Sequence, residues 1–327
     1  MANYLIVGAA GYTGAQLTYR LLAQGHSVRG VVHDPDTPLV DALAAHGMVV
    51  WHGDVTNPHS LVGVADGIEY VYNLTSASIL NTAVLQRTLV DGNQHLLAAC
   101  SRSKSVQAYI YTSGVAVYGD QRVALVTEDT PPKPCCKAGA LMLAAEQVVL
   151  EHTRQHDLPG IVLRVATIYG PERDFTDPVL NRTLTIFGDG NNYVPRIHID
   201  DLLAGLLRVA TYGQAGSIYN VGDDQPLRLR DLYAAMQAML DLPQSPRWYP
   251  HAQALHNGLN PEMVALTTAS VRLCNARMKD ELRLALTYPN ALSWLEERAT
   301  QLAPVLHPID FALTYRSVGE AHALDVV

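Results

Sequence analysis

The stretch Leu5-Ile6-Val7-Gly8-Ala9-Ala10-Gly11-Tyr12-Thr13-Gly14 decides how this chain folds. A short apolar run ends in three glycines spaced three residues apart, and a helical pattern follows them. This order predicts a strand, a tight turn and a helix whose N-terminus is left open. Gly8 lets the chain reverse, Gly11 lets a pyrophosphate lie against bare backbone, and Gly14 lets the helix pack close to the strand. Because the first N–H groups of the helix and the positive end of its dipole would face an anion, the stretch predicts a dinucleotide-binding turn.

Composition and charge narrow the classes of function. The 327 residues are 48% hydrophobic and 17% charged, which suits a globular enzyme of one or two closely joined domains. The net charge is −8 and no lysine or arginine tract occurs, which argues against nucleic acids and anionic membranes as partners. No apolar run approaches the roughly 20 residues of a membrane span, and the N-terminus passes directly into the first strand without a signal segment.

The cysteines and histidines do not form a metal-binding pattern. The four cysteines are Cys100, Cys135, Cys136 and Cys274. A disulfide between the two adjacent ones would be strained. His152 and His156 have a spacing that can hold zinc, but the dipole of the helix on which they lie is the better account of them. We therefore expect no metal and a protein of the reducing cytoplasm.

Strands and helices alternate through the first half of the chain. Buried strands are predicted after the first one at Ser27–His33, Met48–His52, Ile68–Leu74, Gln107–Thr112 and Gly160–Val165. Helices are predicted at Tyr12–Ala23, Asp36–His46, Ile79–Ser101 and Lys137–His156. This rhythm predicts an α/β fold of the Rossmann type, a doubly wound parallel sheet with ligands at the carboxyl ends of its strands.

Beyond Pro171 the elements become shorter and turns more frequent. The change predicts a nucleotide-binding domain over residues 1–172 and a smaller substrate-side lobe over residues 173–327, with a return of the chain to the first sheet around 197–225. The elements predicted there are an aspartate-capped helix at Asp200–Thr211, a strand at Ser217–Val221 and helices at Arg228–Leu240 and Asn290–Leu302. The last residues, from Leu306 on, have no clear period.

The ends of the predicted strands supply the candidate cofactor contacts. At the second strand, Val32 holds the place where an acid that binds a ribose is usual, and His33 the place of a basic residue. This favours NADP, while Asp34 leaves NAD open because it could serve a ribose. Asp54 can accept from an adenine amino group, with a turn or helix cap as its simpler role. The predicted cofactor-binding residues are Gly8, Gly11, Tyr12, Thr13, Gly14, His33, Asp54, Val55, Leu74, Thr75, Thr112 and Ala166.

Several motifs together resemble one known family, the extended short-chain dehydrogenases/reductases, also called the NAD-dependent epimerase/dehydratase family. Besides the glycine stretch they are Gly53-Asp54-Val55, Tyr109-Ile110-Tyr111-Thr112-Ser113, Val117-Tyr118-Gly119-Asp120, Glu128-Asp129-Thr130-Pro131, Leu163-Arg164, Ile168-Tyr169-Gly170-Pro171 and Arg196-Ile197-His198-Ile199-Asp200-Asp201. They span roughly residues 3 to 300 in the family's order. The resemblance implies a Rossmann domain, an NAD(P) cofactor, a smaller C-terminal substrate domain and a homodimer formed through the two long helices.

The same resemblance reveals a loss. The family's chemistry uses a serine or threonine after the fifth strand and a Tyr-x-x-x-Lys pair on the next helix, in which the lysine lowers the pKa of the tyrosine that exchanges a proton with the substrate. In this sequence the serine position matches Gly114, the tyrosine position Ala138 and the lysine position Met142. No tyrosine occurs between Pro131 and Leu158, so a small shift of the alignment cannot restore the motif.

Three interpretations remain open. The first, which we favour, is an atypical ketoreductase that resembles the substrate-assisted ketoreductases of the family, in which a conjugated or internally hydrogen-bonded aromatic ketone of secondary metabolism stabilises its own negative charge. The second is a redox-neutral isomerase, cyclase or lyase that retains its nucleotide. The third is a non-catalytic NAD(P)-binding module of the regulator type. If a proton donor is needed, Ser113 and Tyr118 are the candidates, although each has a simple structural role as well.

The substrate is expected to be a bulky, hydrophobic small molecule. Nucleotide-sugar members of the family usually carry an arginine four residues before the equivalent of His198, and that place is Val194 here. The small and apolar residues at the former relay positions predict a roomy, apolar pocket. Its predicted lining is Ser76, Gly114, Cys135, Ala138, Met142, Thr167, Tyr169 and Arg196.

Overall fold

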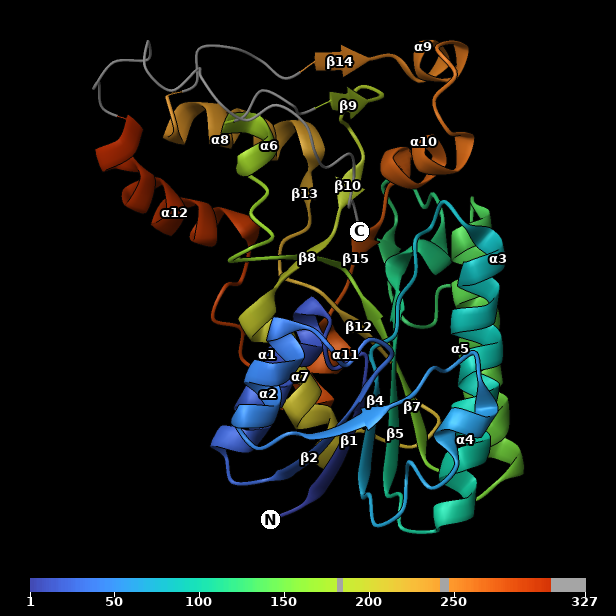
Figure 1. Ribbon diagram of the computed structural model, residues 1–327. Coiled ribbons are helices and arrows are strands. Elements are labelled where there is room, and N and C mark those ends of the chain that lie inside the picture. Colours follow the sequence, from blue (N-terminus) through green and yellow to red (C-terminus); the bar gives the residue numbers. More distant parts are fainter. Residues whose placement is uncertain (181–184, 242–246, 307–327) are drawn as a thin grey trace.

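The computed structural model describes residues 1–180, 185–241 and 247–306, and a seven-stranded sheet runs through it (Figure 1). The strand order is β12-β7-β5-β4-β1-β2-β3, and all neighbours are parallel. The strands are β1 Asn3–Val7, β2 Ser27–Val32, β3 Val49–His52, β4 Tyr70–Asn73, β5 Ala108–Gly114, β7 Gly160–Val165 and β12 Ile218–Val221. The predicted doubly wound parallel sheet is confirmed.

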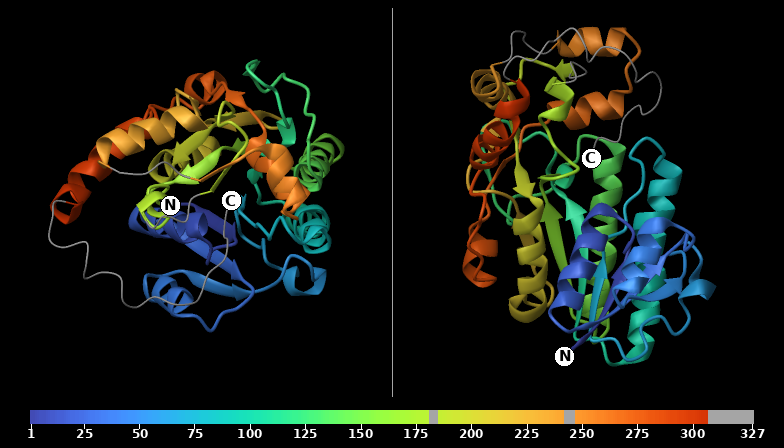
Figure 2. Two further views of the ribbon diagram at one scale, coloured as in Figure 1. Left: turned by 90° about the horizontal axis from the view of Figure 1, so that it is seen from above. Right: turned by 60° about the vertical axis from the view of Figure 1, so that its left-hand side comes forward.

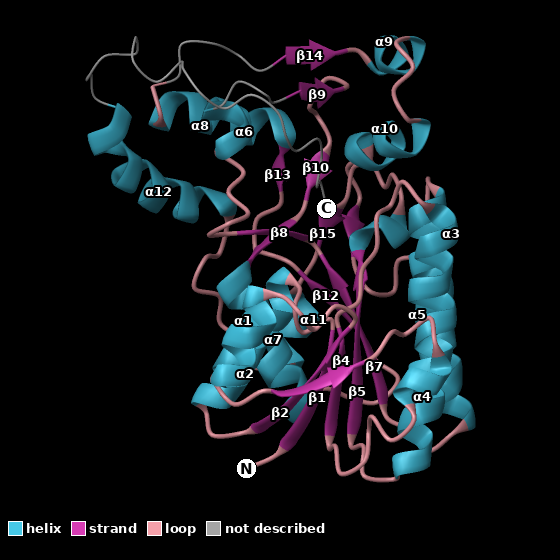
Figure 3. Ribbon diagram, in the orientation of Figure 1, coloured by secondary structure: helices cyan, strands magenta, loops and turns pink. Residues whose placement is uncertain are grey.

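Helices cover both faces of this sheet (Figure 3). One face carries α1 Tyr12–Ala23, α2 Pro38–Ala45 and α7 Ile199–Tyr212, and the other carries α4 Gly92–Ser103 and α5 Lys137–Gln155. Alternate residues of a strand serve the two faces, since Ile6 belongs to the core beneath α1 and α7 while Leu5 and Val7 belong to the core beneath α4 and α5. Helices therefore bury both faces of the sheet, as is usual for a parallel sheet.

A smaller lobe lies beyond the carboxyl ends of the strands (Figure 2). Its helices are α6 Asp177–Leu180, α8 Leu229–Met239, α9 His251–His256, α10 Pro261–Thr268 and α12 Ala291–Leu306. Its strands are β8 Thr167–Tyr169, β9 Thr185–Phe187, β10 Tyr193–Val194, β11 Arg196–His198, β13 Leu227–Arg228, β14 Arg247–Tyr249 and β15 Arg272–Leu273, the last paired with β6 Leu125–Val126. The chain passes from this lobe back to the main sheet through α7 and β12, and α11 Ala276–Glu281 packs beside β12.

Some predicted boundaries were wrong for identifiable reasons. The helix predicted at Ile79–Ser101 consists of α3 Thr82–Leu85, a π-helical segment η2 Gln86–Asp91 and α4. The strand predicted at Gln107–Thr112 extends to Gly114 because β7 pairs with it up to Val165. The cap of α7 is His198, whose Nδ1 accepts from the N–H of Asp200, and not an aspartate. The segment after Leu306, for which no period was found, lies outside the described residues.

Short 3-10 turns complete the fold at η1 Pro58–Leu61 and η3 Val115–Tyr118. The η3 turn directly follows β5 and packs against α5. Glycine is required where the two meet, because a β-carbon on Gly139 would lie 2.6 Å from the carbonyl oxygen of Ala116. The N-terminal end of α5 is thereby held against the end of β5.

A buried ion pair fixes α5 to the sheet. Nε and Nη2 of Arg164 on β7 donate to the carboxylate of Glu146 on α5, at 3.1 and 2.7 Å. Both side chains are almost fully buried. The Arg164 guanidinium also lies 4.7 Å from the ring centroid of Tyr118, whose hydroxyl donates to Asn220 at 2.6 Å. The helix that carries positions 138 and 142 is therefore held by charge as well as by apolar packing.

Removing one partner of this pair should destabilise the protein strongly. We expect Glu146→Ala to lower the free energy of unfolding by about 3–5 kcal/mol, because the Arg164 charge would remain buried without a counter-charge. Urea denaturation followed by circular dichroism measures the change. On the same helix, Glu151 is exposed, so Glu151→Ala should change stability by no more than about 0.5 kcal/mol. Equal losses for the two variants would contradict this role of the pair.

Candidate nucleotide site and substrate face

The glycine turn after β1 has the geometry of an anion site. Gly8 has φ +87°, and a β-carbon on Gly14 would lie 2.1 Å from the Gly8 carbonyl oxygen, so α1 can approach β1 only with glycine there. Gly11 is the N-cap of α1 and makes no side-chain cap hydrogen bond. The first helical bond runs from the Ala15 N–H to the Gly11 carbonyl at 2.9 Å. The N–H groups of the three residues in between therefore precede the helical bonding pattern and are suited to bind a pyrophosphate.

The end of β4 meets this turn at the switch point of the sheet. The order β4-β1-β2 makes the chain connections diverge between β1 and β4, where ligands of such sheets bind. The Leu74 carbonyl oxygen lies 3.1 Å from the place of a Gly8 β-carbon. Thr75 donates to the Asn73 side chain from its N–H and its hydroxyl, and the Thr112 hydroxyl donates to the Asn73 carbonyl at 3.2 Å. The predicted cofactor-binding residues Gly8, Leu74, Thr75 and Thr112 come from three separate segments, and they thus lie along the carboxyl edge of the sheet.

The candidate adenosine contacts lie at the ends of β2 and β3. His33 is exposed directly after β2. Asp54 is partly exposed after β3, and one of its oxygens accepts from the Thr56 N–H at 2.8 Å. Val55 is 6% exposed, and its side chain lies 2.9 Å from where a β-carbon on Gly92 would stand. Ala166 is 4% exposed. Val55 and Ala166 can therefore offer a ligand little more than backbone.

Two of the positions that the resemblance assigns to the relay, 114 and 142, are adjacent in space. The sulfur of Met142 lies 3.3 Å from the place of a β-carbon on Gly114, so the two residues face each other. The thioether occupies the space beside Gly114. Ala138 is only 2% exposed and belongs to the core beneath α5, which corrects its assignment to the lining of a roomy pocket.

The two predicted proton donors have different surroundings. Tyr118 is fully buried, its hydroxyl is bound to Asn220, and burial raises its pKa. This placement does not fit a proton donor to substrate and corrects that assignment. Ser113 is 8% exposed, and its hydroxyl has no hydrogen-bond partner among the described residues. Ser113 is thus the member of the pair that keeps a free polar atom.

The other predicted pocket residues fall into two groups. Ser76, Cys135 and Thr167 are exposed. Tyr169 and Arg196 are buried at the base of the lobe, which corrects the expectation that they line an open pocket. Nη1 of Arg196 donates to the Val194 carbonyl at 2.9 Å, and the Tyr169 hydroxyl has no partner among the described residues.

Sequence analysis missed Asp223, which belongs with the buried group. Its N–H donates to the Arg196 carbonyl at 2.7 Å, its side chain is 3% exposed, and one carboxyl oxygen has no partner in the described part of the chain. Burial raises the pKa of Asp223 to about 8. The only available signal was an acid that follows a predicted strand by two residues, as Asp54 does. Arg196, Tyr169 and Asp223 therefore form a buried polar cluster beside the start of β8.

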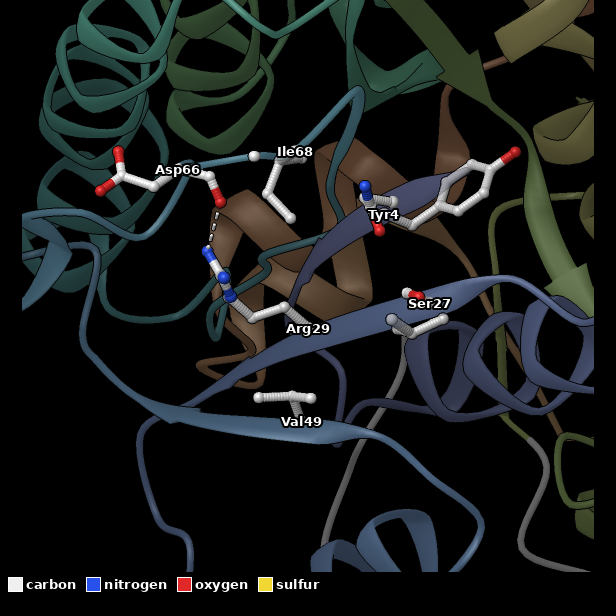
Figure 4. A pocket seen from close by; sticks show the side chains of 9 residues that line it. Tyr4, Ser27, Arg29, Val49, Asp66 and Ile68 are labelled. Carbon is white, nitrogen blue, oxygen red and sulfur yellow. Dashed lines mark hydrogen bonds between the residues drawn. The ribbon is translucent and has the colours of Figure 1, made fainter. Parts of the chain in front are cut away.

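Two cavities lie elsewhere. One, of about 260 Å³, is at the amino ends of β1 and β2, opposite to the glycine turn (Figure 4). Its Arg29 is already satisfied, since Nη1 donates to the carbonyls of Val64 and Asp66 at 2.6 and 3.2 Å. The other, of about 350 Å³, is a groove between Thr82 on α3 and Leu141 on α5. Neither coincides with the predicted apolar pocket.

Metal-binding and membrane-spanning features were also sought. Within residues 1–180, 185–241 and 247–306, no three histidine, cysteine or acidic side chains are grouped as a metal site would need. His152 and His156 lie with ring centroids 4.3 Å apart, and Nε2 of His152 is 2.7 Å from the Ser101 hydroxyl. Among the same residues, no helix combines the length and apolarity needed to cross a bilayer.

Comparison with known proteins identifies the family. The sequence pattern of the NAD dependent epimerase/dehydratase family matches residues 4–222. The chain belongs to this family. A dTDP-glucose 4,6-dehydratase of Streptomyces griseus is 30% identical over 254 residues, which cover 70% of this chain and 76% of that protein. A UDP-glucose 4-epimerase of Mycolicibacterium smegmatis is 26% identical over 267 residues, which cover 75% of this chain and 85% of the epimerase.

Solved structures support the same fold. A functionally unknown conserved protein from Silicibacter pomeroyi is 28% identical with a TM-score of 0.71, and the match covers 92% of this chain and 99% of that one. A Bacillus anthracis dTDP-glucose 4,6-dehydratase in complex with NAD is 18% identical with a TM-score of 0.76, covering 93% and 97%. The chain thus shares the Rossmann fold of these structures. The expected NADP preference is left untested by these comparisons.

The glycine turn gives the first prediction for this site. Gly14→Ala should weaken NADH and NADPH binding by about tenfold or more, equivalent to ~1.4 kcal/mol, because α1 must move away from β1. Titration of the nucleotide against intrinsic fluorescence measures this. Gly205→Ala on α7 is the matched control, since its β-carbon would meet only Leu284 at an ordinary 3.6 Å. Unchanged affinity in Gly14→Ala would rule out the turn as the nucleotide site.

The buried carboxyl gives a prediction of pH dependence. In the folded protein Asp223 keeps its proton up to about pH 8, whereas in the unfolded chain it ionises near pH 4. Between these values the folded state binds more protons, so this group makes the protein less stable as pH rises, by about 1 kcal/mol per pH unit. Asp223→Asn removes this titration and should gain stability relative to wild type between about pH 5 and about pH 8.

Urea denaturation at several pH values in this window measures the difference. Asp280→Asn is the control, because it makes the same change at an exposed position. Parallel curves for wild type and Asp223→Asn would show that the carboxyl ionises normally in the folded protein.

Proposed function

We propose that the protein is an NAD(P)-dependent oxidoreductase that reduces the carbonyl group of a bulky, apolar substrate without a Tyr/Lys proton relay. The observation that carries the proposal is the contact between positions 114 and 142. Gly114 and Met142 face each other there, and the Met142 sulfur lies 3.3 Å from where a β-carbon on Gly114 would stand. The glycine turn after β1 is intact.

The chain's own residues define what the protein can contribute. The N–H groups that follow Gly11 bind the pyrophosphate, and Asp54 and His33 lie where the adenosine end is expected. The bound nucleotide supplies the hydride. Gly114, Ala138 and Met142 carry no ionisable group, so none of them can give or take the substrate proton. A conjugated or internally hydrogen-bonded aromatic ketone would stabilise its own alkoxide, and solvent water would protonate it afterwards.

The substrate face favours an apolar molecule over a nucleotide sugar. The family position for an arginine that holds a diphosphate is Val194, and Arg196 is buried with an N–H bound to the Val194 carbonyl. Ser76 and Thr167, at the strand ends, are exposed and uncharged. The dehydratase and epimerase relatives act on dTDP-glucose and UDP-glucose according to their names, which makes a nucleotide sugar the alternative to be tested. The exposed His33 supports NADPH as the reductant.

Isotope transfer tests the proposal. The purified protein is incubated with NADPH or NADH deuterated at the reducing carbon and with aromatic ketones that carry a neighbouring phenol, simple aliphatic ketones, UDP-glucose or dTDP-glucose. We expect one deuterium in the alcohol formed from an aromatic ketone and a preference for NADPH. At a nucleotide concentration below saturation, Gly14→Ala should slow the transfer, because it binds the cofactor more weakly.

Two results would overturn the proposal. Conversion of a nucleotide sugar without net consumption of reductant would indicate redox-neutral chemistry. Nucleotide binding with no deuterium transfer to any carbonyl would indicate a binding module. Mass analysis of any nucleotide released on denaturation supports either conclusion, since a redox-neutral enzyme would retain the oxidised form tightly.

A further inference from the structure

Two adjacent cysteines lie at the start of α5, and nothing in the proposed reduction uses them. Cys136 is the N-cap of this 19-residue helix, and its Sγ accepts from the Gly139 N–H at 3.4 Å. The first turn of α5 carries no acidic residue of its own, and the thiol sulfur faces the positive end of the helix dipole. This environment favours a thiolate.

The neighbouring thiol is accessible and contacts the lobe. Cys135 is exposed, and its Sγ donates to the Ala265 carbonyl on α10 at 3.6 Å. On the same helix, the Glu262 carboxylate accepts from the Lys137 N–H at 2.5 Å. The start of α5 therefore joins the nucleotide-binding domain to α10 through one thiol and one carboxylate.

We propose that Cys136 and Cys135 form a peroxide-sensitive thiol pair, in which Cys136 is oxidised first and Cys135 resolves it. The Cys136 thiolate attacks one oxygen of hydrogen peroxide, the O–O bond breaks, and the sulfur becomes a sulfenic acid as water leaves after protonation. The Cys135 sulfur then attacks the Cys136 sulfur, its S–H proton leaves with the hydroxyl as a second water, and an S–S bond forms. Two thiols and one peroxide thus give one disulfide and two waters.

The electrostatics around Cys136 support the order of the two steps. Its hydrogen bond with Cys135 and the backbone N–H groups of Gly139 and Ala138 lower the pKa of Cys136 to about 6, against burial and the facing charge of Glu262. The hydrogen bond with Cys136, burial, and the charges of Cys136 and Asp120 raise the pKa of Cys135 well above its usual value. Burial raises the pKa of Cys100 to about 12. Cys136 is 8% exposed and lies directly beside the exposed Cys135.

Oxidation would change the contact between the two parts of the molecule. A disulfide removes the sulfur that caps α5 and the S–H that Cys135 donates to Ala265. A bond between adjacent cysteines is strained, which makes it easy to reduce again. The pair is therefore suited to a reversible change at the end of the helix that carries Ala138 and Met142.

Trapping and mass spectrometry test the pair in the full-length protein. With hydrogen peroxide and dimedone, Cys135→Ser should accumulate the dimedone adduct at Cys136, because the resolving thiol is gone. Wild type should instead lose two hydrogens and show a linked Cys135–Cys136 peptide that dithiothreitol restores. Cys136→Ser should give neither product, and it should fold, since serine is a good N-cap. Cys274→Ser is the matched control and should behave as wild type.

The pH dependence separates this account from simple exposure. Alkylation of Cys136 by iodoacetamide in the wild-type protein, located by fragment mass spectra, should accelerate as pH rises through about pH 6 and then level off, because the thiolate is the nucleophile. In Cys135→Ser the midpoint should move upward, because the hydrogen bond from Cys135 is lost. Adducts at Cys274 or Cys100 that form as fast as the one at Cys136, or a wild-type midpoint near that of an ordinary thiol, would overturn the proposal.

Discussion

The close approach of α1 to β1 is the constraint on which the rest of the molecule depends. With a β-carbon on Gly14 only 2.1 Å from the Gly8 carbonyl oxygen, no other residue allows the helix to begin where it does. Because α1 begins there, its first N–H groups lie at the carboxyl edge of the sheet beside Leu74 and Thr75. The switch between β1 and β4 then determines where a dinucleotide can lie, and the lobe stands over that edge.

The buried pair of Arg164 and Glu146 has the corresponding role on the substrate side. The side chains of Arg164 and Glu146 are only 3% and 1% exposed, so water cannot solvate either charge if the pair breaks. A shift of α5 along β7 would break the pair and is therefore opposed. The pair therefore holds Ala138 and Met142 in place beside β5 and β7. The proposed reaction site depends on this fixed position of α5.

Sequence reasoning recovered the parts of the structure that local chemistry determines. The glycine spacing predicted the turn, and the alternation of apolar strands and amphipathic helices predicted the sheet. What it missed depends on contacts between distant segments. The burial of Tyr118 requires Asn220 from β12, and the burial of Arg196 and Asp223 requires β8, β11 and the end of β12 to meet. His198 was taken to precede an aspartate cap, but the geometry of β11 makes its own ring the acceptor.

The pairing of Gly114 with Met142 is the packing that the proposed function needs. Protein interiors are close-packed, so two small residues facing each other would leave unfilled volume at the end of β5. Here the smallest residue faces a long, adaptable thioether that fills this space. Ala138 is likewise packed into the core beneath α5 and is not left at the rim of a void. If the protein reduces an apolar ketone as proposed, the substrate can lie against the end of β5 without facing a charge at positions 114, 138 or 142.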